Sequence, residues 1–266
     1  MNKYRIPTLT IAGSDSSGGA GIQADLKTFA AIGTYGMSVI TSITAQNTMG
    51  VIDVEDLSCE IIKKQIDAVF NDIRPKATKI GMVSNTKIIM EIVHSLKRHG
   101  VENLVLDPVM ISKSGYSLLK IEAKEALISS LIPLAKVITP NVPEAEEITS
   151  LKIDNLDSMR VAGDKILRMG PEYVLIKGGH LEGDAVDLLV WKGGSKIYKS
   201  ERICRKNTHG TGCTLSSAIT AYLALGYEVD EAVLKAKKYI TEAIEYSFDI
   251  GKGIGPVHHF YNWDKE

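Results

Sequence analysis

The sequence lacks a strong charge of either sign and any long apolar run. It carries 31 Lys and Arg against 32 Asp and Glu, a formal net charge of −1, so no overall field draws it to nucleic acid or an anionic membrane. No segment approaches the roughly 20 consecutive apolar residues that a membrane-spanning helix requires. The N-terminal residues also lack the apolar stretch of a signal peptide. We therefore expect a cytoplasmic protein that binds a small molecule, with no nucleic-acid or membrane partner.

Cysteine is also scarce. The three cysteines, Cys59, Cys204 and Cys213, are odd in number and scattered, and no pair has the close spacing of a zinc or redox motif. This pattern fits a reducing compartment. A content of 44% hydrophobic and 24% charged residues is typical of a globular chain and excludes a disordered one.

Short apolar runs alternate with segments of helical period, which predicts an α/β fold with a mostly parallel central sheet flanked by helices. No Gly/Ser/Pro-rich linker interrupts the alternation, so we expect one domain over residues 1–266. Residues 185–199 differ, because two strand-like runs flank a glycine-containing turn and predict an antiparallel hairpin at the sheet edge. The expected strands are 8–12, 38–45, 78–80, 104–106, 137–139 and 174–176, and the expected helices cover 61–70, 88–96, 126–131, 215–223 and 232–240.

Polar residues follow four of the expected strands: Gln46, Asp107, Asn141 and Lys177. Ligands of open α/β sheets bind beyond the carboxyl ends of the strands, so these side chains should converge on one edge. Glu144 stands where a helix begins. Its carboxylate is either a partner of the helix end or a ligand in a magnesium shell.

A glycine-rich run over residues 13–21 follows the first strand. Gly13 and Gly18 have the spacing of a P-loop, but Gly19 and Ala20 stand where Lys and Ser or Thr are required, and the dinucleotide pattern is absent as well. The run is either a tight strand-to-helix turn or a turn that lets backbone approach a flat ligand.

Residues 207–214 carry a second glycine-rich turn, placed just before a helix that we expect to begin near Leu215. Free backbone N–H groups and the helix dipole make such a start a phosphate site, which suits phosphoryl transfer. Cys213 lies there, and a helix N-terminus lowers a thiol pKa, which would let it accept a proton. The alternative is a small buried residue that packs the helix start. His209 is either an anion contact or a surface residue.

Together these motifs resemble the hydroxymethylpyrimidine/phosphomethylpyrimidine kinases of thiamine biosynthesis, in the ribokinase-like superfamily. The likeness covers nearly the whole chain, in family order. Besides the Cys213 turn, it lies in residues 10–15 (TIAGSD), 18–28 (GGAGIQADLKT), 44–48 (TAQNT), 79–82 (KIGM), 106–110 (LDPVM), 139–141 (TPN), 177–180 (KGGH) and 253–259 (GIGPVHH).

The resemblance implies a ribokinase-like three-layer sandwich that acts as a homodimer with ATP and Mg²⁺. It further implies two successive phosphorylations in one site, first of 4-amino-5-hydroxymethyl-2-methylpyrimidine and then of its monophosphate. Residue by residue, it implies a pyrimidine pocket formed by Gln46, Gly13, Asp15, Asp25, Met82 and Val109. It implies an anion hole formed by Gly210, Thr211 and Gly212, with Cys213 as the base and with Asp107 and Glu144 organising the metal. On the nucleotide side it implies Lys177, Thr208, Asn141 and Lys113, with Lys113 in a mobile cover.

Two other functions compete with this one. The first is a pyridoxal kinase of the same fold, since both acceptors are small aromatic rings with a hydroxymethyl group. Sugar kinases of the superfamily usually carry aspartate at the position of Cys213, so the cysteine argues against a sugar acceptor. The second is a pyrimidine-binding sensor without turnover, which the presence of Asp107, Lys177 and the glycine turn disfavours.

Overall fold

The computed structural model describes residues 6–110, 118–179 and 185–265. Its strands are β1 (Pro7–Ala12), β2 (Tyr35–Ile40), β3 (Ser42–Asn47), β4 (Gly50–Asp56), β5 (Ala77–Ile80), β6 (Leu104–Leu106), β7 (Val137–Ile138), β8 (Tyr173–Lys177), β9 (Ala185–Trp191) and β10 (Gly194–Ser200). Its α-helices are α1 (Gly21–Ile32), α2 (Cys59–Asp72), α3 (Thr86–His99), α4 (Lys124–Ala126), α5 (Val142–Thr149), α6 (Leu156–Leu167), α7 (Thr211–Ala224) and α8 (Val229–Glu245).

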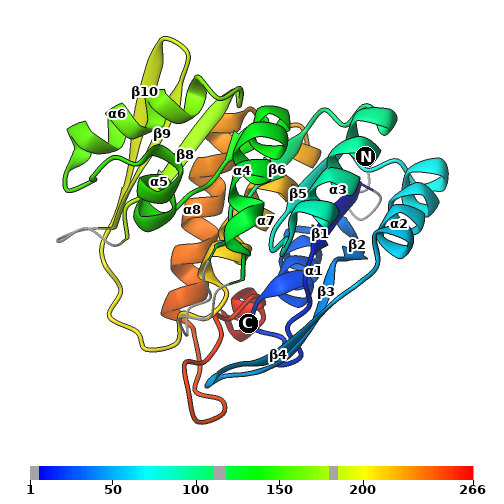
Figure 1. Ribbon diagram of the computed structural model, residues 1–266. Helices are drawn as coiled ribbons and strands as arrows, with labels where there is room; N and C mark the ends of the chain where they lie inside the picture. Colours follow the sequence, from blue (N-terminus) through cyan, green and yellow to red (C-terminus); the bar gives the residue numbers. More distant parts are fainter. Residues whose placement is uncertain (1–5, 111–117, 180–184, 266) are drawn as a thin grey trace.

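The central sheet has eight strands in the order β10-β9-β8-β7-β6-β5-β1-β2 (Figure 1). Neighbours from β2 to β8 pair in parallel, whereas β9 and β10 are antiparallel. This confirms the predicted α/β fold and the hairpin at the sheet edge. The hairpin turns tightly, since Trp191 pairs with Gly194, and Gly193 takes a positive φ of 86°.

Helices cover both faces of the sheet because its strands are apolar on both faces. In β6, Leu104 and Leu106 join the core under α2, α3, α5 and α6, whereas Val105 joins the core under α7 and α8. The alternation follows from the two-residue period of a strand. None of the helices in the described part of the chain combines the length and apolar character needed to cross a membrane.

One predicted strand is wrong. Residues 38–45 do not form a single strand: β2 ends at Ile40, and β3 leaves the sheet to pair with β4 in a separate antiparallel ribbon. The sequence did not predict β4, because the apolar residues Val51, Ile52 and Val54 do not alternate regularly with polar ones and the strand is half exposed. Gln46 therefore lies on this ribbon and not at the end of a sheet strand.

The sheet order reverses direction between β1 and β5. From β1 the chain moves outward to β2, then returns to β5 and continues through β6, β7 and β8 on the other side. Such a switch point leaves a crevice at the carboxyl ends of the two strands. The glycine-rich turn after β1 and Met82 after β5 border that crevice.

We expect the buried side of α2 to contribute to stability and its exposed side to contribute little. Ile62 is fully buried, while its neighbour Ile61 is 44% exposed. Ile62→Ala should lower the free energy of unfolding by about 2–5 kcal/mol, and the matched variant Ile61→Ala should change it by less than about 0.5 kcal/mol. Urea unfolding followed by circular dichroism measures both, and equal midpoints for the two variants would contradict this packing.

Candidate active site

A cavity of about 740 Å³ opens at the carboxyl edge of the sheet. Of the residues that the sequence analysis assigned to a site, Lys113 lies outside the described residues, and Asp25 is absent from the cavity wall. The others line the cavity: Gly13, Asp15, Gln46, Met82, Asp107, Val109, Asn141, Glu144, Lys177, Thr208, Gly210, Thr211, Gly212 and Cys213.

A cluster of opposite charges lies at the ends of β6 and β8. Lys177 Nζ is 2.8 Å from Asp107 Oδ1 and 4.0 Å from Glu144 Oε2. Burial favours the neutral form of Asp107, but the ammonium groups of Lys177 and Lys79 hold its pKa below the ordinary value. Burial raises the pKa of Glu144 to about 7, with Lys177 opposing the shift and Asp107 adding to it. The cluster therefore contains one carboxylate that stays ionised, Asp107, and one carboxyl group with a pKa near neutral pH, Glu144.

Glu144 also has a structural role. Its Oε2 accepts a hydrogen bond from the Asn141 backbone N–H at 2.8 Å, and Asn141 Oδ1 accepts one from the Glu144 N–H at 2.8 Å. This capping box begins α5 and fixes both side chains at the cavity wall. Within the described residues, no group of three His, Cys, Asp or Glu side chains comes together as a ready-made metal site.

The second glycine turn is part of a helix start, as expected, but α7 begins at Thr211 and not near Leu215. Gly210 precedes it with a φ of 79°, and its position offers no side-chain cap to the first N–H groups of the described helix. The start of the helix lies beside the charge cluster, since a Cβ at Gly212 would lie 3.5 Å from both Asp107 Oδ2 and Lys177 Nζ. An anion bound at the helix start would therefore meet Lys177 as well.

The two glycine-rich turns pack against each other. A Cβ at Gly210 would lie 1.8 Å from the Gly19 carbonyl oxygen, and a Cβ at Gly19 would lie 2.3 Å from the His209 ring. His209 Nε2 in turn lies 2.8 Å from Asp15 Oδ2. Burial disfavours a charged Asp15, but hydrogen bonds from His209 and Ser17 lower its pKa to about 2. His209 is therefore a contact that joins the turns and not a surface residue.

Cys213 lines the cavity in the first turn of α7. The prediction that its thiol pKa is lowered is wrong. Burial raises its pKa to about 11; the charge of Lys79 opposes this shift, while Asp25 and Asp107 add to it. The helix start alone was expected to lower that pKa. Removal from water is the largest influence on the pKa at this position.

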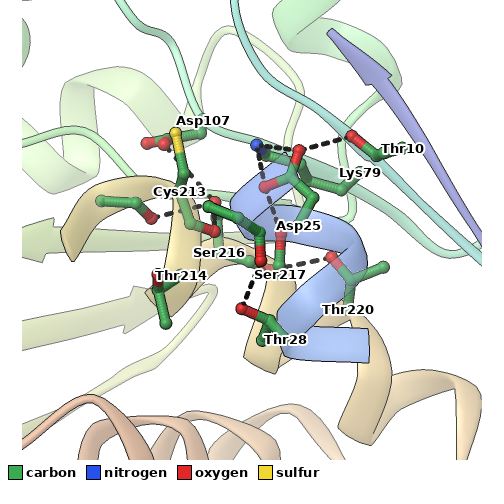
Figure 2. Close-up of polar contacts among 12 residues, drawn as sticks. Thr10, Asp25, Thr28, Lys79, Asp107, Cys213, Thr214, Ser216, Ser217 and Thr220 are labelled. Atoms are coloured by element: carbon green, nitrogen blue, oxygen red, sulfur yellow. Dashed lines mark hydrogen bonds and ion pairs between the residues drawn. The ribbon is translucent and has the colours of Figure 1, made fainter. Parts of the chain in front are cut away.

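Asp25 does not shape the cavity wall, which corrects the expectation from sequence. Its side chain is fully buried behind the wall and forms an ion pair with Lys79, whose Nζ lies 2.8 Å from each carboxylate oxygen (Figure 2). The sequence offered a signal for this pair, because Lys79 is a charged residue within the short apolar strand β5.

The far end of the cavity was not predicted from the sequence. It lies beside β9 and α8, where Lys237 Nζ pairs with Asp187 Oδ2 at 2.6 Å. Asp187 Oδ1 also accepts a hydrogen bond from the Gly178 N–H at 3.0 Å. A carboxylate within the apolar run of β9 is the signal that could have revealed it.

Comparison with known proteins gives a consistent result. A family model described as phosphomethylpyrimidine kinase matches residues 15–258. The hydroxymethylpyrimidine/phosphomethylpyrimidine kinase of Rhizobium meliloti (strain 1021) is 52% identical over 263 residues, 97% of this chain and 98% of that protein. The crystal structure of phosphomethylpyrimidine kinase from Clostridium difficile 630 has a TM-score of 0.83 and 69% identity, over 90% of this chain and 100% of that one. An ADP complex of Bacillus subtilis pyridoxal kinase has a TM-score of 0.90 and 41% identity, over 97% and 98% of the two chains.

The raised pKa of Glu144 predicts a pH-dependent stability. Between its ordinary pKa of 4.5 and about 7, the folded protein holds a proton that the unfolded chain has released, so stability falls as pH rises. Glu144→Gln keeps the capping box and removes this titration, so it should gain stability over the wild type across that range. Urea unfolding from pH 4.5 to 8 measures the difference.

Glu146 provides a control on the same helix. Hydrogen bonds from the Ile153 N–H and Lys152 lower its pKa below the ordinary value of 4.5, so the stability difference between Glu146→Gln and the wild type should change little from pH 4.5 to 8. A stability difference between Glu144→Gln and the wild type that stays constant at all pH values would contradict the raised pKa of Glu144.

Proposed function

The chain belongs to the phosphomethylpyrimidine kinase family, and from this premise we propose how its cavity carries out the reaction. The enzyme transfers the γ-phosphoryl group of ATP to the hydroxymethyl group of 4-amino-5-hydroxymethyl-2-methylpyrimidine, and then phosphorylates the monophosphate to the diphosphate, in thiamine biosynthesis. One observation carries the proposal: the glycine turn before α7, the Asp107–Lys177 pair and Gln46 all line a single cavity.

The acceptor ring occupies the part of the cavity beside β1 and the ribbon. Gly13 and Met82 give it a flat wall, since a Cβ at Gly13 would lie 3.0 Å from the Met82 sulfur. Gln46 supplies an amide within 3.3 Å of the Thr44 hydroxyl and 3.4 Å of His209 Nε2. An amide both donates and accepts, which suits a ring with amino and ring-nitrogen groups. Asp15 and Val109 complete this wall.

ATP binds along the other half of the cavity. Lys177 meets its phosphates, with Asn141 and Thr208 beside them, and the end near Asp187 and Lys237 receives the nucleoside. In this arrangement the γ-phosphoryl group lies at the N–H groups of Gly210, Thr211 and Gly212. Positioning and electrostatic stabilisation of this kind supply most of the catalysis in phosphoryl transfer.

Cys213 accepts the proton of the acceptor hydroxyl. As the bond from the γ-phosphorus to the acceptor oxygen forms, the bond to the ADP oxygen breaks and the hydroxyl proton passes to the Cys213 thiolate. A thiol with a pKa of about 11 is largely protonated at neutral pH, so the thiolate is a minor form. A loose transition state tolerates this, because little bonding to the acceptor oxygen has developed when the phosphoryl group leaves.

Asp107 and Glu144 would hold Mg²⁺ together with the ATP phosphates. Carboxylate oxygens are the ligands that Mg²⁺ prefers, and one or two of them with substrate phosphates suffice. Both carboxyl groups reach the cavity beside Lys177, so the residues present fit a metal that arrives with its nucleotide. When bound, the ion would neutralise negative charge on the phosphate oxygens.

The quaternary structure and location form part of the same proposal. The enzyme is a homodimer of single-domain chains spanning residues 1–266, in the cytoplasm, where ATP is made and where its three free cysteines stay reduced. Sedimentation equilibrium measures the oligomeric state directly, and a monomer mass at micromolar concentration would contradict the dimer.

A test of substrate separates this function from its alternatives. Incubation with ATP and the hydroxymethylpyrimidine should yield products heavier by one and then two phosphoryl groups, detected by mass spectrometry. Pyridoxal, offered in parallel because of the structural likeness to a pyridoxal kinase, should react with a lower kcat/KM. A preference for pyridoxal would overturn the acceptor, and acceptor binding without ATP consumption would indicate a sensor.

The role of Cys213 predicts a selective loss of turnover. Cys213→Ala should lower kcat by a factor on the order of 10² to 10⁴, the usual effect of a general base, while the dissociation constant of the pyrimidine changes little. Cys204→Ala is the matched control, because Cys204 is exposed. Steady-state kinetics and calorimetry measure the two quantities, and near-wild-type turnover of Cys213→Ala would remove the base assignment.

A further inference from the structure

The proposed reaction leaves one buried charge without a function. Lys79 lies on β5 with its side chain fully buried, and placing an ammonium group in a protein interior is costly unless it is paired. In other proteins, replacing a buried ion pair by hydrophobic residues of similar volume is often neutral or stabilising. The pair therefore calls for an explanation beyond packing.

Asp25 holds Lys79 in a single arrangement. Its Oδ2 accepts a hydrogen bond from Thr10 Oγ1 at 2.6 Å, and its Oδ1 accepts one from Ser217 Oγ at 2.6 Å. Lys79 Nζ donates to both oxygens at 2.8 Å. These four residues belong to α1, β1, α7 and β5 and are all fully buried, so the carboxylate is saturated and cannot rotate away.

The ammonium lies close to the reacting end of the sheet. A Cβ at Gly81, the residue directly after β5, would lie 2.7 Å from Lys79 Nζ. Figure 2 shows Nζ between the Asp25 carboxylate and the side of the cluster that carries the Cys213 sulfur and the Asp107 carboxylate. The charge of Lys79 lowers the pKa of both groups, and on Cys213 its effect exceeds the opposite effects of Asp25 and Asp107 taken singly.

We propose that Lys79 is a positioning residue for catalysis: Asp25 fixes its buried charge so that the positive end of the ion pair faces Cys213 and stabilises negative charge there. The pair acts as a fixed dipole behind the cavity wall. In a site removed from water such a charge is weakly screened and needs no rearrangement during the reaction. The inference rests on the proposed role of Cys213 as the proton acceptor.

The rival explanation is that the pair only joins α1, α7 and the sheet. An uncharged pair of similar size separates the two explanations, because it can preserve packing but not the charge. The double variant Asp25→Asn/Lys79→Met removes both charges together and avoids leaving one of them buried alone. The single variant Asp25→Asn removes only the negative end.

Alkylation of Cys213 by the neutral reagent iodoacetamide at pH 8 measures the effect without ATP or acceptor. The double variant should react more slowly than wild type and Asp25→Asn faster, with about a tenfold difference between the two variants, the change expected for one pKa unit. Peptide-resolved mass spectrometry follows each cysteine separately. The exposed Cys204 in the same digest serves as the internal control and should react at one rate in all three proteins.

The proposal would be overturned if Cys213 in the folded double variant were alkylated at the wild-type rate. Circular dichroism establishes folding, and the double variant suffices if Asp25→Asn alone does not fold. In the folded double variant kcat should also fall several-fold with the KM for ATP little changed, and an unchanged kcat would equally count against it. Failure of the wild-type enzyme to phosphorylate the pyrimidine would instead refute the proposed function, so the two failures are distinguishable.

Discussion

The site depends on a contact between two glycine-rich turns. Gly19 and Gly210 approach so closely that a Cβ at position 210 would lie 1.8 Å from the Gly19 carbonyl oxygen. The contact brings the turn after β1, which borders the acceptor half of the cavity, against the helix start that would bind a phosphoryl group. His209 completes it by reaching Asp15. The acceptor and phosphate halves therefore share one cavity because backbone meets backbone with no side chain between them.

Paired charges surround the residue proposed to accept the proton. Lys177 balances Asp107 on the cavity side, and Lys79 balances Asp25 behind the wall. Buried charges are tolerated when they are paired and hydrogen-bonded. The charges of Lys79, Asp25 and Asp107 act on Cys213 with opposite signs, and burial is the largest influence on its pKa. Its buried surroundings thus set its acidity.

Patterns in the chain predict the parts of this fold that rest on strongly apolar segments. The strands from β5 to β8 and the edge hairpin follow from short apolar runs and a glycine turn, and the polar residues after them, Asp107 and Lys177, meet as parallel strands require. The ribbon of β3 and β4 escapes prediction because its half-exposed strands carry little periodic apolar signal. Its pairing comes from contacts that local patterns do not encode.

The sequence by itself determined the fold class, the family and the set of residues gathered at the carboxyl edge of the sheet, because strand period, glycine spacing and motif order are local properties. Only the tertiary structure decided how those residues act. In the folded chain Asp25 pairs with Lys79 behind the cavity wall, and His209 contacts Asp15 and so joins the two turns. Burial raises the pKa of Cys213, whereas the local helix start predicted a lower value. Burial and charge pairing depend on residues distant in the chain, and a pKa responds to both.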